Sequence, residues 1–252
     1  MTTTALAPGP SLGRLTTVEF RKMADTRAGM WLLASIGAIG VAIITLELFV
    51  VKPAELTFQT FLEGTYIPVN VLLPVLGILS VTSEWTQRTN LTTFALVPER
   101  HRIAAAKLVA AVAIAGLSIG AGLATAALGN LAGMAFADGN GSWHLAGDAL
   151  AGAALAQVIA VVMGVGFGML LMNSALAIVL YFLLPTVWTV LAGLSTAVER
   201  VSDWLNIGVT TEPLFGGAMT GDDWRKLAAS VGLWVVLPLA LGVVRLLKRE
   251  VK

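Results

Sequence analysis

The chain has 252 residues, of which 57% are hydrophobic and only 12% are charged, and its mean hydropathy is +0.84. These values exclude an ordinary soluble domain and indicate an integral membrane protein. The formal net charge of +1 gives no indication of nucleic-acid binding, and the absence of cysteine excludes disulfides and thiolate metal sites.

Residues 1–29 are predicted to form a tail followed by an amphipathic helix. Thr16 and Glu19 have the spacing of a capping box, which predicts that the helix begins there. One face would be apolar and the other charged, with Phe20, Met23, Ala24 and Trp31 opposite Arg21, Lys22 and Asp25. Such a helix suits the membrane interface, whereas a basic flank that only orients the first span explains the pattern equally well.

Six apolar runs follow, and each is near or above the ~20 residues that a helix needs to cross ~30 Å of hydrocarbon. They cover 30–51, 66–83, 104–134, 149–171, 174–197 and 227–247. One helix over the fourth and fifth runs would be ~74 Å long, so we expect the chain to turn back at Asn173. The prediction is an all-α, polytopic membrane protein with six transmembrane helices in one domain, 1–252.

The basic residues predict the orientation, because cytoplasmic segments retain Lys and Arg. With both termini cytoplasmic, twelve of the sixteen basic residues lie inside, and the other four are Lys52, Arg200, Arg225 and Lys226. The segment 84–103 is then cytoplasmic, and the segment 198–226 is extracytoplasmic. The latter carries tryptophans among its acids, which favours a short helix or a re-entrant cap at the outer headgroups.

Several polar or small-residue patterns inside the runs have structural interpretations. GLSIG at 116–120 and GVGFG at 164–168 are interpreted as close helix packing rather than a nucleophile elbow or a nucleotide loop. Glu47 is expected near the outer interface, close to Lys52. Three prolines, Pro74, Pro185 and Pro238, are expected to kink their helices. Four polar side chains are expected mainly to bridge helices: Asn70, Asn130, Gln157 and Ser174.

The segment EWTQRTNLTTFALVPERHR, residues 84–102, is longer than a reversal between two helices requires. Asn90 is a suitable cap for a short helix that bears Leu91 and Phe94. An apolar patch of this kind is edged by three arginines, Arg88, Arg100 and Arg102. Such a patch is typical of a protein-docking element, although a basic loop lying on anionic lipid has the same composition.

One set of residues, Glu84, Arg88 and Thr89 followed by Pro98, Arg100, Ile103 and Lys107, resembles the signature of type-two ABC exporter permeases. This family includes daunorubicin-type drug exporters and polysaccharide exporters. The segment before the first span, the six spans and the aromatic loop before the last span are also similar to it. Asn90 departs from the family pattern, in which a small residue often follows the Arg-Thr pair.

The resemblance implies a permease that works as a dimer, with a second copy or a paralogue, in a bacterial plasma membrane. Two separate ATP-binding subunits would supply hydrolysis, with ATP and Mg on those subunits. This chain contains no Gly-x-x-x-x-Gly-Lys-Ser/Thr loop, so we do not expect it to be an enzyme or to hold a cofactor or metal. The alternative is a membrane scaffold or sensor that recruits a cytoplasmic partner and transports nothing.

The resemblance also implies site residues. The docking contact for the ATP-binding subunits would include Glu84, Arg88, Arg100 and Lys107, and the apolar patch with its basic edge adds Leu91, Phe94 and Arg102. The interface helix beside it, in contact with lipid, would include Phe20, Arg21, Lys22 and Met23. The substrate path would run between the second and fifth spans, past Asn70, Phe182 and Trp188.

Overall fold

A computed structural model describes residues 10–87, 99–194, 196–217 and 219–248, and these residues form helices and loops without a strand. Six of the helices are long and apolar enough to cross a membrane, which confirms the predicted number and fits a multi-pass membrane protein. They are α2 (Arg27–Val50), α3 (Phe58–Thr86), α5 (Arg100–Phe136), α6 (Gly147–Leu171), α7 (Ser174–Ala192) and a last helix, Gly221–Lys248. The last helix consists of α11 (Gly221–Val231), a π-helical turn (Gly232–Val236) and α12 (Leu237–Lys248).

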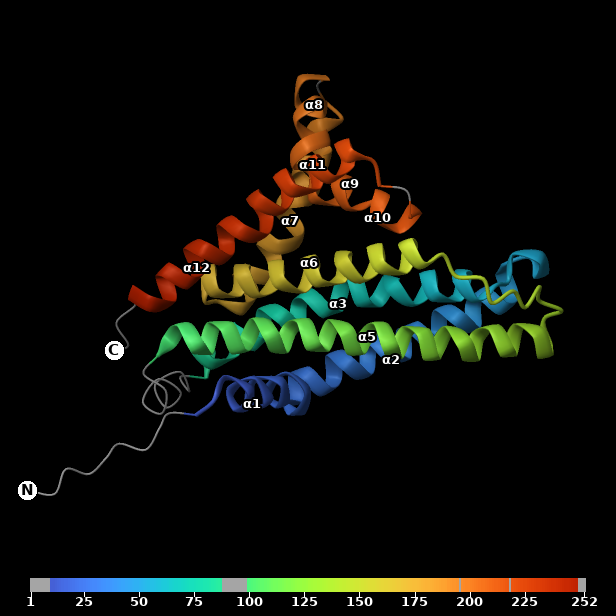
Figure 1. The fold of residues 1–252 in the computed structure, drawn as a ribbon, viewed down its shortest axis with the longest axis horizontal. Helices are drawn as coiled ribbons and strands as arrows, with labels where there is room; N and C mark the ends of the chain where they lie inside the picture. Colours follow the sequence, from blue (N-terminus) through green and yellow to red (C-terminus); the bar gives the residue numbers. More distant parts are fainter. Residues whose placement is uncertain (1–9, 88–98, 195, 218, 249–252) are drawn as a thin grey trace, which may run out of the picture.

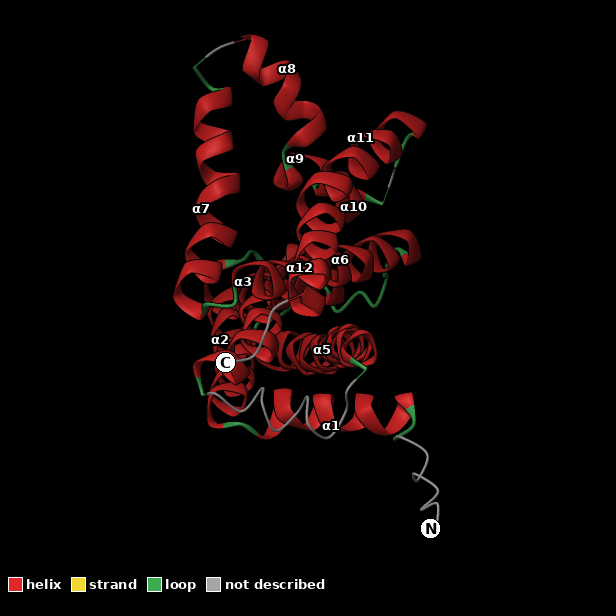
Figure 2. Ribbon diagram, turned by 90° about the vertical axis from the view of Figure 1, so that its left-hand side faces the viewer, coloured by secondary structure: helices red, strands yellow, loops and turns green. Residues whose placement is uncertain are grey.

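Helices α2, α3, α5 and α6 run along the long axis of the molecule, and α12 packs against α6 (Figure 1). The end of α3, the start of α5 and the end of α12 lie together at one end, which we call the base. Helix α1 (Leu12–Asp25) also lies at the base. Viewed along the bundle, α5 is nearly end-on while α1 is seen from the side, so α1 crosses the direction of the long helices (Figure 2).

Helices α3 and α6 form the centre, and 61% of the apolar window of each is buried. Glycines bring their backbones together. A Cβ on Gly77 would lie 2.7 Å from the carbonyl oxygen of Val161, and a Cβ on Gly164 would lie 2.4 Å from that of Pro74. The GVGFG segment therefore packs closely, as predicted, because only glycine permits this approach.

The GLSIG segment does not pack in this way. A Cβ on Gly116 or Gly120 would meet nothing within 4 Å, and both glycines are exposed on α5. The predicted close packing of this pair is therefore not made against another described helix of the chain. The reason is that the face of α5 that carries them points away from α3 and α6.

Helix α1 begins earlier than predicted. Ser11 caps it by accepting a hydrogen bond from the Arg14 amide, so Thr16 lies inside the helix. The helix ends at Asp25, and the hydroxyl of the next residue, Thr26, caps α2. A Cβ on Gly29 would lie 1.8 Å from the carbonyl oxygen of Met23. This tight elbow separates the predicted apolar face into two parts, because Met23 is buried whereas Trp31 of α2 is 75% exposed.

The reversal at Asn173 is confirmed. Met172 adopts a left-handed backbone, and the Asn173 side chain caps α7 by accepting from the Leu176 amide at 2.9 Å. Helix α7 then leaves the long bundle, and only Ala177 and Tyr181 of its residues are buried (Figure 2). The turn places α7 beside α3 and α6 at its start and leaves most of its apolar surface uncovered within the chain.

The segment 198–226 forms short helices, as predicted. It contains most of α8 (Thr196–Leu205), all of α9 (Ile207–Thr211) and α10 (Pro213–Gly216), and the start of α11. The Trp234 indole donates to the carbonyl oxygen of Leu205 at 2.6 Å, and the hydroxyls of Thr210 and Ser230 are 2.5 Å apart. These bonds hold the short helices against the last helix.

Polar side chains bridge the helices at several of the predicted positions. The Ser118 hydroxyl shares its proton between the Ala115 carbonyl oxygen at 2.8 Å and the Gln157 side-chain oxygen at 3.3 Å, and the second contact joins α5 to α6. The Ser174 hydroxyl donates to that of Thr82 at 2.8 Å and joins α7 to α3. Asn130 donates instead to carbonyls of the 137–146 loop. Pro74 and Pro185 lie inside α3 and α7, while Pro238 follows the π-helical turn.

We predict that Gly164→Ala lowers the free energy of unfolding in detergent by about 1–3 kcal/mol, because the new methyl group meets the backbone of α3. The matched control is Gly120→Ala, where the same methyl group meets open space. That control should be neutral or stabilise by up to about 1 kcal/mol. Equal thermal stability of the two variants would contradict the proposed α3 and α6 contact.

Candidate functional site

The base contains a group of four charged side chains, which we call the base cluster. Glu19 and Lys22 come from α1, Glu84 from the last turn of α3, and Lys107 from α5. The Lys107 ammonium lies 2.5 Å from Glu19 and 3.0 Å from Glu84. The Lys22 ammonium lies 2.7 Å from Glu19 and 2.8 Å from Glu84. Each lysine thus bridges the same two carboxylates, and three helices meet at one neutral cluster.

The base cluster is largely removed from solvent. Glu19 is 5% exposed, Glu84 is 8% exposed and Lys107 is 3% exposed. The third hydrogen bond of the Lys107 ammonium goes to the carbonyl oxygen of Ser80 at 2.7 Å. All three donors of this ammonium are therefore used, which is the condition under which a lysine can be buried with its charge.

The electrostatics of the cluster depend on mutual pairing. A carboxylate in the last turn of a helix faces the negative end of the helix dipole, so Glu84 needs nearby cations to stay ionised. Burial alone would lower the pKa of Lys22, but the carboxylates of Glu19 and Glu84 outweigh it and raise this pKa above its ordinary value. Removing any one of the four side chains would leave one charge of the opposite sign in the cluster without a compensating partner.

Lys22 is the most accessible member, with 36% of its side chain exposed. It borders a cleft of about 740 Å³ between the elbow that joins α1 to α2 and the end of α3. Polar groups from both sides line this cleft, including Arg27, Ser83 and Gln87. The cluster is thus sealed on the side of α5 and open on the side of the elbow.

Two arginines attach the first turn of α5 to its surroundings. Arg100 donates to the carbonyl oxygen of Leu246 in α12 at 3.0 Å. Arg102 donates to the carbonyl oxygen of Pro10 at 2.6 Å and pairs with Glu99 at 3.2 Å. Together with the base cluster, these bonds anchor both helices that flank residues 87–99.

The predicted docking residues fall into three groups. Arg88, Leu91 and Phe94 lie outside the described residues. Arg100 and Arg102 are held by carbonyl groups of the chain. Glu84 and Lys107 are buried in the base cluster, so the structure does not present them at the surface as a docking contact would require.

The predicted interface-helix residues also differ in their burial. Met23 is buried and Phe20 packs against the same hydrophobic core, whereas Arg21 is exposed. Sequence reasoning missed the role of Glu19, which it treated only as a capping residue. The available signal was its position on the apolar side of α1, three residues before Lys22, where an acid is costly unless it is paired.

Two of the predicted path residues come together. Asn70 of α3 and Phe182 of α7 line one cavity of about 320 Å³, together with Tyr181, Pro185 and Phe215. Trp188 does not line this cavity, and its buried indole nitrogen has no hydrogen-bond partner among the described residues. The cavity is mainly aromatic and aliphatic, with an amide at one side.

Glu47 does not pair with Lys52 in the described structure. Its carboxylate packs instead on α3, where a Cβ on Gly64 would lie 2.4 Å from one oxygen, and the other oxygen is buried without a hydrogen bond from a described residue. Within the described ranges, no group of three or more histidine, aspartate or glutamate side chains is arranged to hold a metal ion.

Comparison with models of known protein families and with curated protein sequences found no match to this chain.

We predict that Lys107→Met lowers the free energy of unfolding by about 3–5 kcal/mol, because it leaves buried carboxylates short of a cation. The measurement is thermal or denaturant unfolding in mild detergent. Lys226→Met is the matched control, since Lys226 pairs with Asp222 on an exposed turn of α11 and should change stability little. Similar losses in the two variants would refute the structural importance of the base cluster.

Proposed function

We propose that the protein is the membrane-spanning permease subunit of an ATP-driven exporter. In this proposal, separate ATP-binding subunits bind at residues 84–103, which lie on the cytoplasmic side. The observation that carries the proposal is the base cluster, because its buried charges join α1 to α3 and α5, the helices that precede and follow that segment in the chain. The residues of segment 84–107 that resemble the signature of ABC exporter permeases also support the proposal.

Separating the buried charges of the base cluster is costly. Breaking a buried ion pair by removing one partner typically costs about 3–5 kcal/mol, so α1, α3 and α5 are expected to move together at the base. A displacement of residues 84–103 by a bound subunit would then act on all three helices. Helix α3 would carry the movement to α6, because glycines join their backbones.

The movement of α3 and α6 would also change the cavity that Asn70 and Phe182 line. Both residues belong to helices that would move in this proposal. Helix α3 runs from the base to the cavity, and α7 is bonded to α3 through Ser174 and Thr82. We propose that this cavity is part of the substrate path. Its aromatic lining suits an amphiphilic substrate better than an ion.

A second copy of the chain or a paralogue completes the proposed assembly. Helix α7 exposes a row of large apolar residues and buries only two, so lipid or another chain must cover it. The proposal assigns part of this surface to the second permease, and assigns ATP and Mg to two ATP-binding subunits. The proposed location is a plasma membrane, in which the end of the bundle called the base faces the cytoplasm because it is rich in Lys and Arg.

The proposed orientation predicts which introduced cysteines react from outside. Thr92→Cys should resist a membrane-impermeant maleimide in intact cells and react after the cells are opened. His144→Cys, in the exposed loop between α5 and α6 at the other end of the bundle, should react in intact cells. Each variant has one cysteine, because the chain has none of its own. Labelling of position 92 from outside would overturn the orientation.

The proposed docking predicts that Arg102→Glu uncouples ATP hydrolysis from the permease. The test purifies the chain with a copurifying P-loop ATPase and compares the hydrolysis rate with that of the ATPase alone. Stimulation by the chain should fall at least about fivefold, the lower end of typical coupling effects between sites. Arg100→Glu should behave similarly, whereas Lys52→Glu, exposed at the opposite end, should leave stimulation unchanged.

Thermal unfolding of each variant separates uncoupling from misfolding, since both arginines also bond to carbonyl groups of the chain. Full stimulation in both folded arginine variants would contradict docking at this segment. Recruitment of a partner whose hydrolysis never depends on the chain would instead favour a scaffold or sensor.

A further inference from the structure

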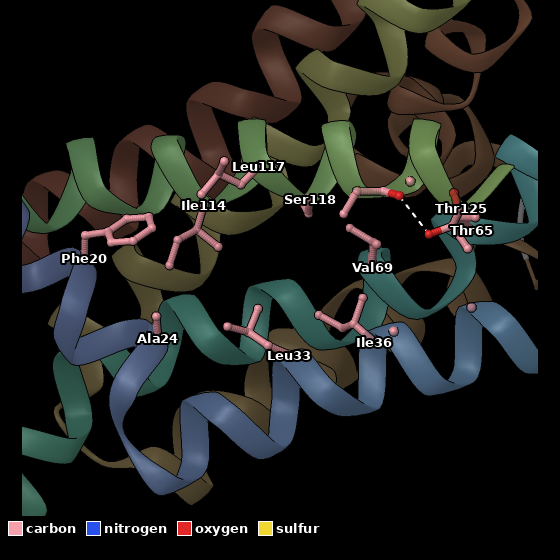
Figure 3. Close-up of a pocket in the computed structure, with 14 residues that line it drawn as sticks. Phe20, Ala24, Leu33, Ile36, Thr65, Val69, Ile114, Leu117, Ser118 and Thr125 are labelled. Atoms are coloured by element: carbon pink, nitrogen blue, oxygen red, sulfur yellow. Dashed lines mark hydrogen bonds between the residues drawn. The ribbon is translucent and has the colours of Figure 1, made fainter. Parts of the chain in front are cut away.

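A further cleft lies between α2, α3 and α5, and α1 borders its base end, so it shares no lining residue with the Asn70 cavity. Its volume is about 270 Å³. Side chains of α1, α2, α3 and α5 line it, and Figure 3 shows Phe20 and Ala24 at one end and Thr65 and Thr125 at the other. The floor is buried, whereas Gly37 and Leu117 at the mouth are exposed. The cleft thus opens on the outer surface of the helices, where a bilayer would surround them.

The lining offers hydrocarbon and almost nothing else. Its three hydroxyls belong to Thr65, Ser118 and Thr125, and each donates to a carbonyl oxygen in its own helix, at 2.7 Å, 2.8 Å and 2.8 Å respectively. They are therefore satisfied without a ligand. A polar molecule would find no directed donor there, and apolar cavities larger than about 150 Å³ accept hydrocarbon ligands and exclude water.

Glycines keep the cleft open. A Cβ on Gly37 or Gly40 of α2 would meet nothing within 4 Å, although Gly40 is buried. A buried glycine normally marks a close contact, as at Gly77 and Gly164. At Gly40 the backbone faces unfilled volume instead, so the space is not a by-product of tight packing between helices.

Cationic residues border the base end of the cleft. Arg14 and Arg21 are seven residues apart, so they lie on one side of α1, next to the Phe20 and Ala24 face and away from buried Glu19. Both are exposed, and neither forms an ion pair with a described residue, including Asp25 one turn after Arg21. An anionic group at this position would complement two positive charges.

We infer that the cleft binds one acyl chain of an anionic phospholipid, whose phosphate lies at Arg21 and Arg14. The hydrocarbon lining accounts for the chain, the open mouth for entry from the bilayer, and the arginines for the headgroup. This site is separate from the proposed substrate path, and it does not depend on the permease function. The lipid would fill the space between α1, α2 and α5 beside the base cluster.

The test uses a phosphatidylglycerol probe with a photoreactive diazirine on one acyl chain, in phosphatidylcholine liposomes that contain the purified protein. Mass spectrometry locates the labelled residues. Labelling should concentrate on Leu33, Ile36, Ile114 and Leu117 rather than on exposed apolar residues elsewhere, such as Val41 and Leu128.

Gly40→Leu should reduce labelling of the cleft at least about tenfold, because its side chain excludes roughly two or more methylene groups of the lipid. Gly37→Leu is a second filling variant in case the first fails to fold. Gly116→Leu is the matched control, since the same substitution on α5 also meets open space but lies outside the cleft. It should leave labelling unchanged.

Arg21→Gln tests the headgroup contact. It should lower labelling by the phosphatidylglycerol probe more than labelling by a matched phosphatidylcholine probe, because only the first carries a net negative charge. Uniform labelling of all lipid-facing residues would reduce the cleft to ordinary membrane contact and overturn the proposal. Undiminished labelling in a folded Gly40→Leu or Gly37→Leu variant would overturn it equally.

Discussion

The arrangement at the base depends on two lysines that neutralise two carboxylates where water is largely excluded. A buried ion pair adds little to stability when compared with apolar residues of the same size, but its partners cannot be separated cheaply. Glu19, Lys22, Glu84 and Lys107 therefore constrain position more than they stabilise the fold. They oblige α1, which crosses the bundle, to stay with the end of α3 and the first turns of α5.

Packing elsewhere follows two different rules. Between α3 and α6, glycines let the backbones meet, and this contact forms a firm centre. Between α2 and α5, glycines leave a cleft with an apolar lining. The centre is suited to carrying a displacement from one end to the other. The cleft is suited to holding a molecule from the surrounding bilayer, because no described side chain fills it.

Helix α1 connects the two proposals. One side carries Glu19 and Met23 into the bundle, and another places Phe20 and Ala24 over the cleft, with arginines beside them. The same short helix thus bonds to the helices that flank the proposed docking segment and borders the proposed lipid site. Different sides of this amphipathic helix therefore contact the buried charge cluster, line the hydrocarbon cleft and form part of the outer surface.

The sequence alone determined the number and type of the main elements. An apolar run of about 20 residues must satisfy its backbone hydrogen bonds internally in a bilayer, so six runs predict six helices, and the described part of the chain contains six helices of that length and composition. The turn at Asn173 was predictable for a similar reason, since one helix could not contain both runs, and an asparagine side chain caps the next helix locally. Neither inference required knowledge of a partner helix.

Only the tertiary structure decided which residues meet. Glu19, Glu84 and Lys107 are far apart in the chain, so no local pattern could pair them, and the segment signature drew attention to Glu84 and Lys107 as surface contacts instead. GLSIG and GVGFG have similar glycine spacing, yet one faces outward and the other touches a neighbouring backbone. The physical reason is that helix periodicity defines faces, whereas the packing of the whole bundle decides what each face contacts.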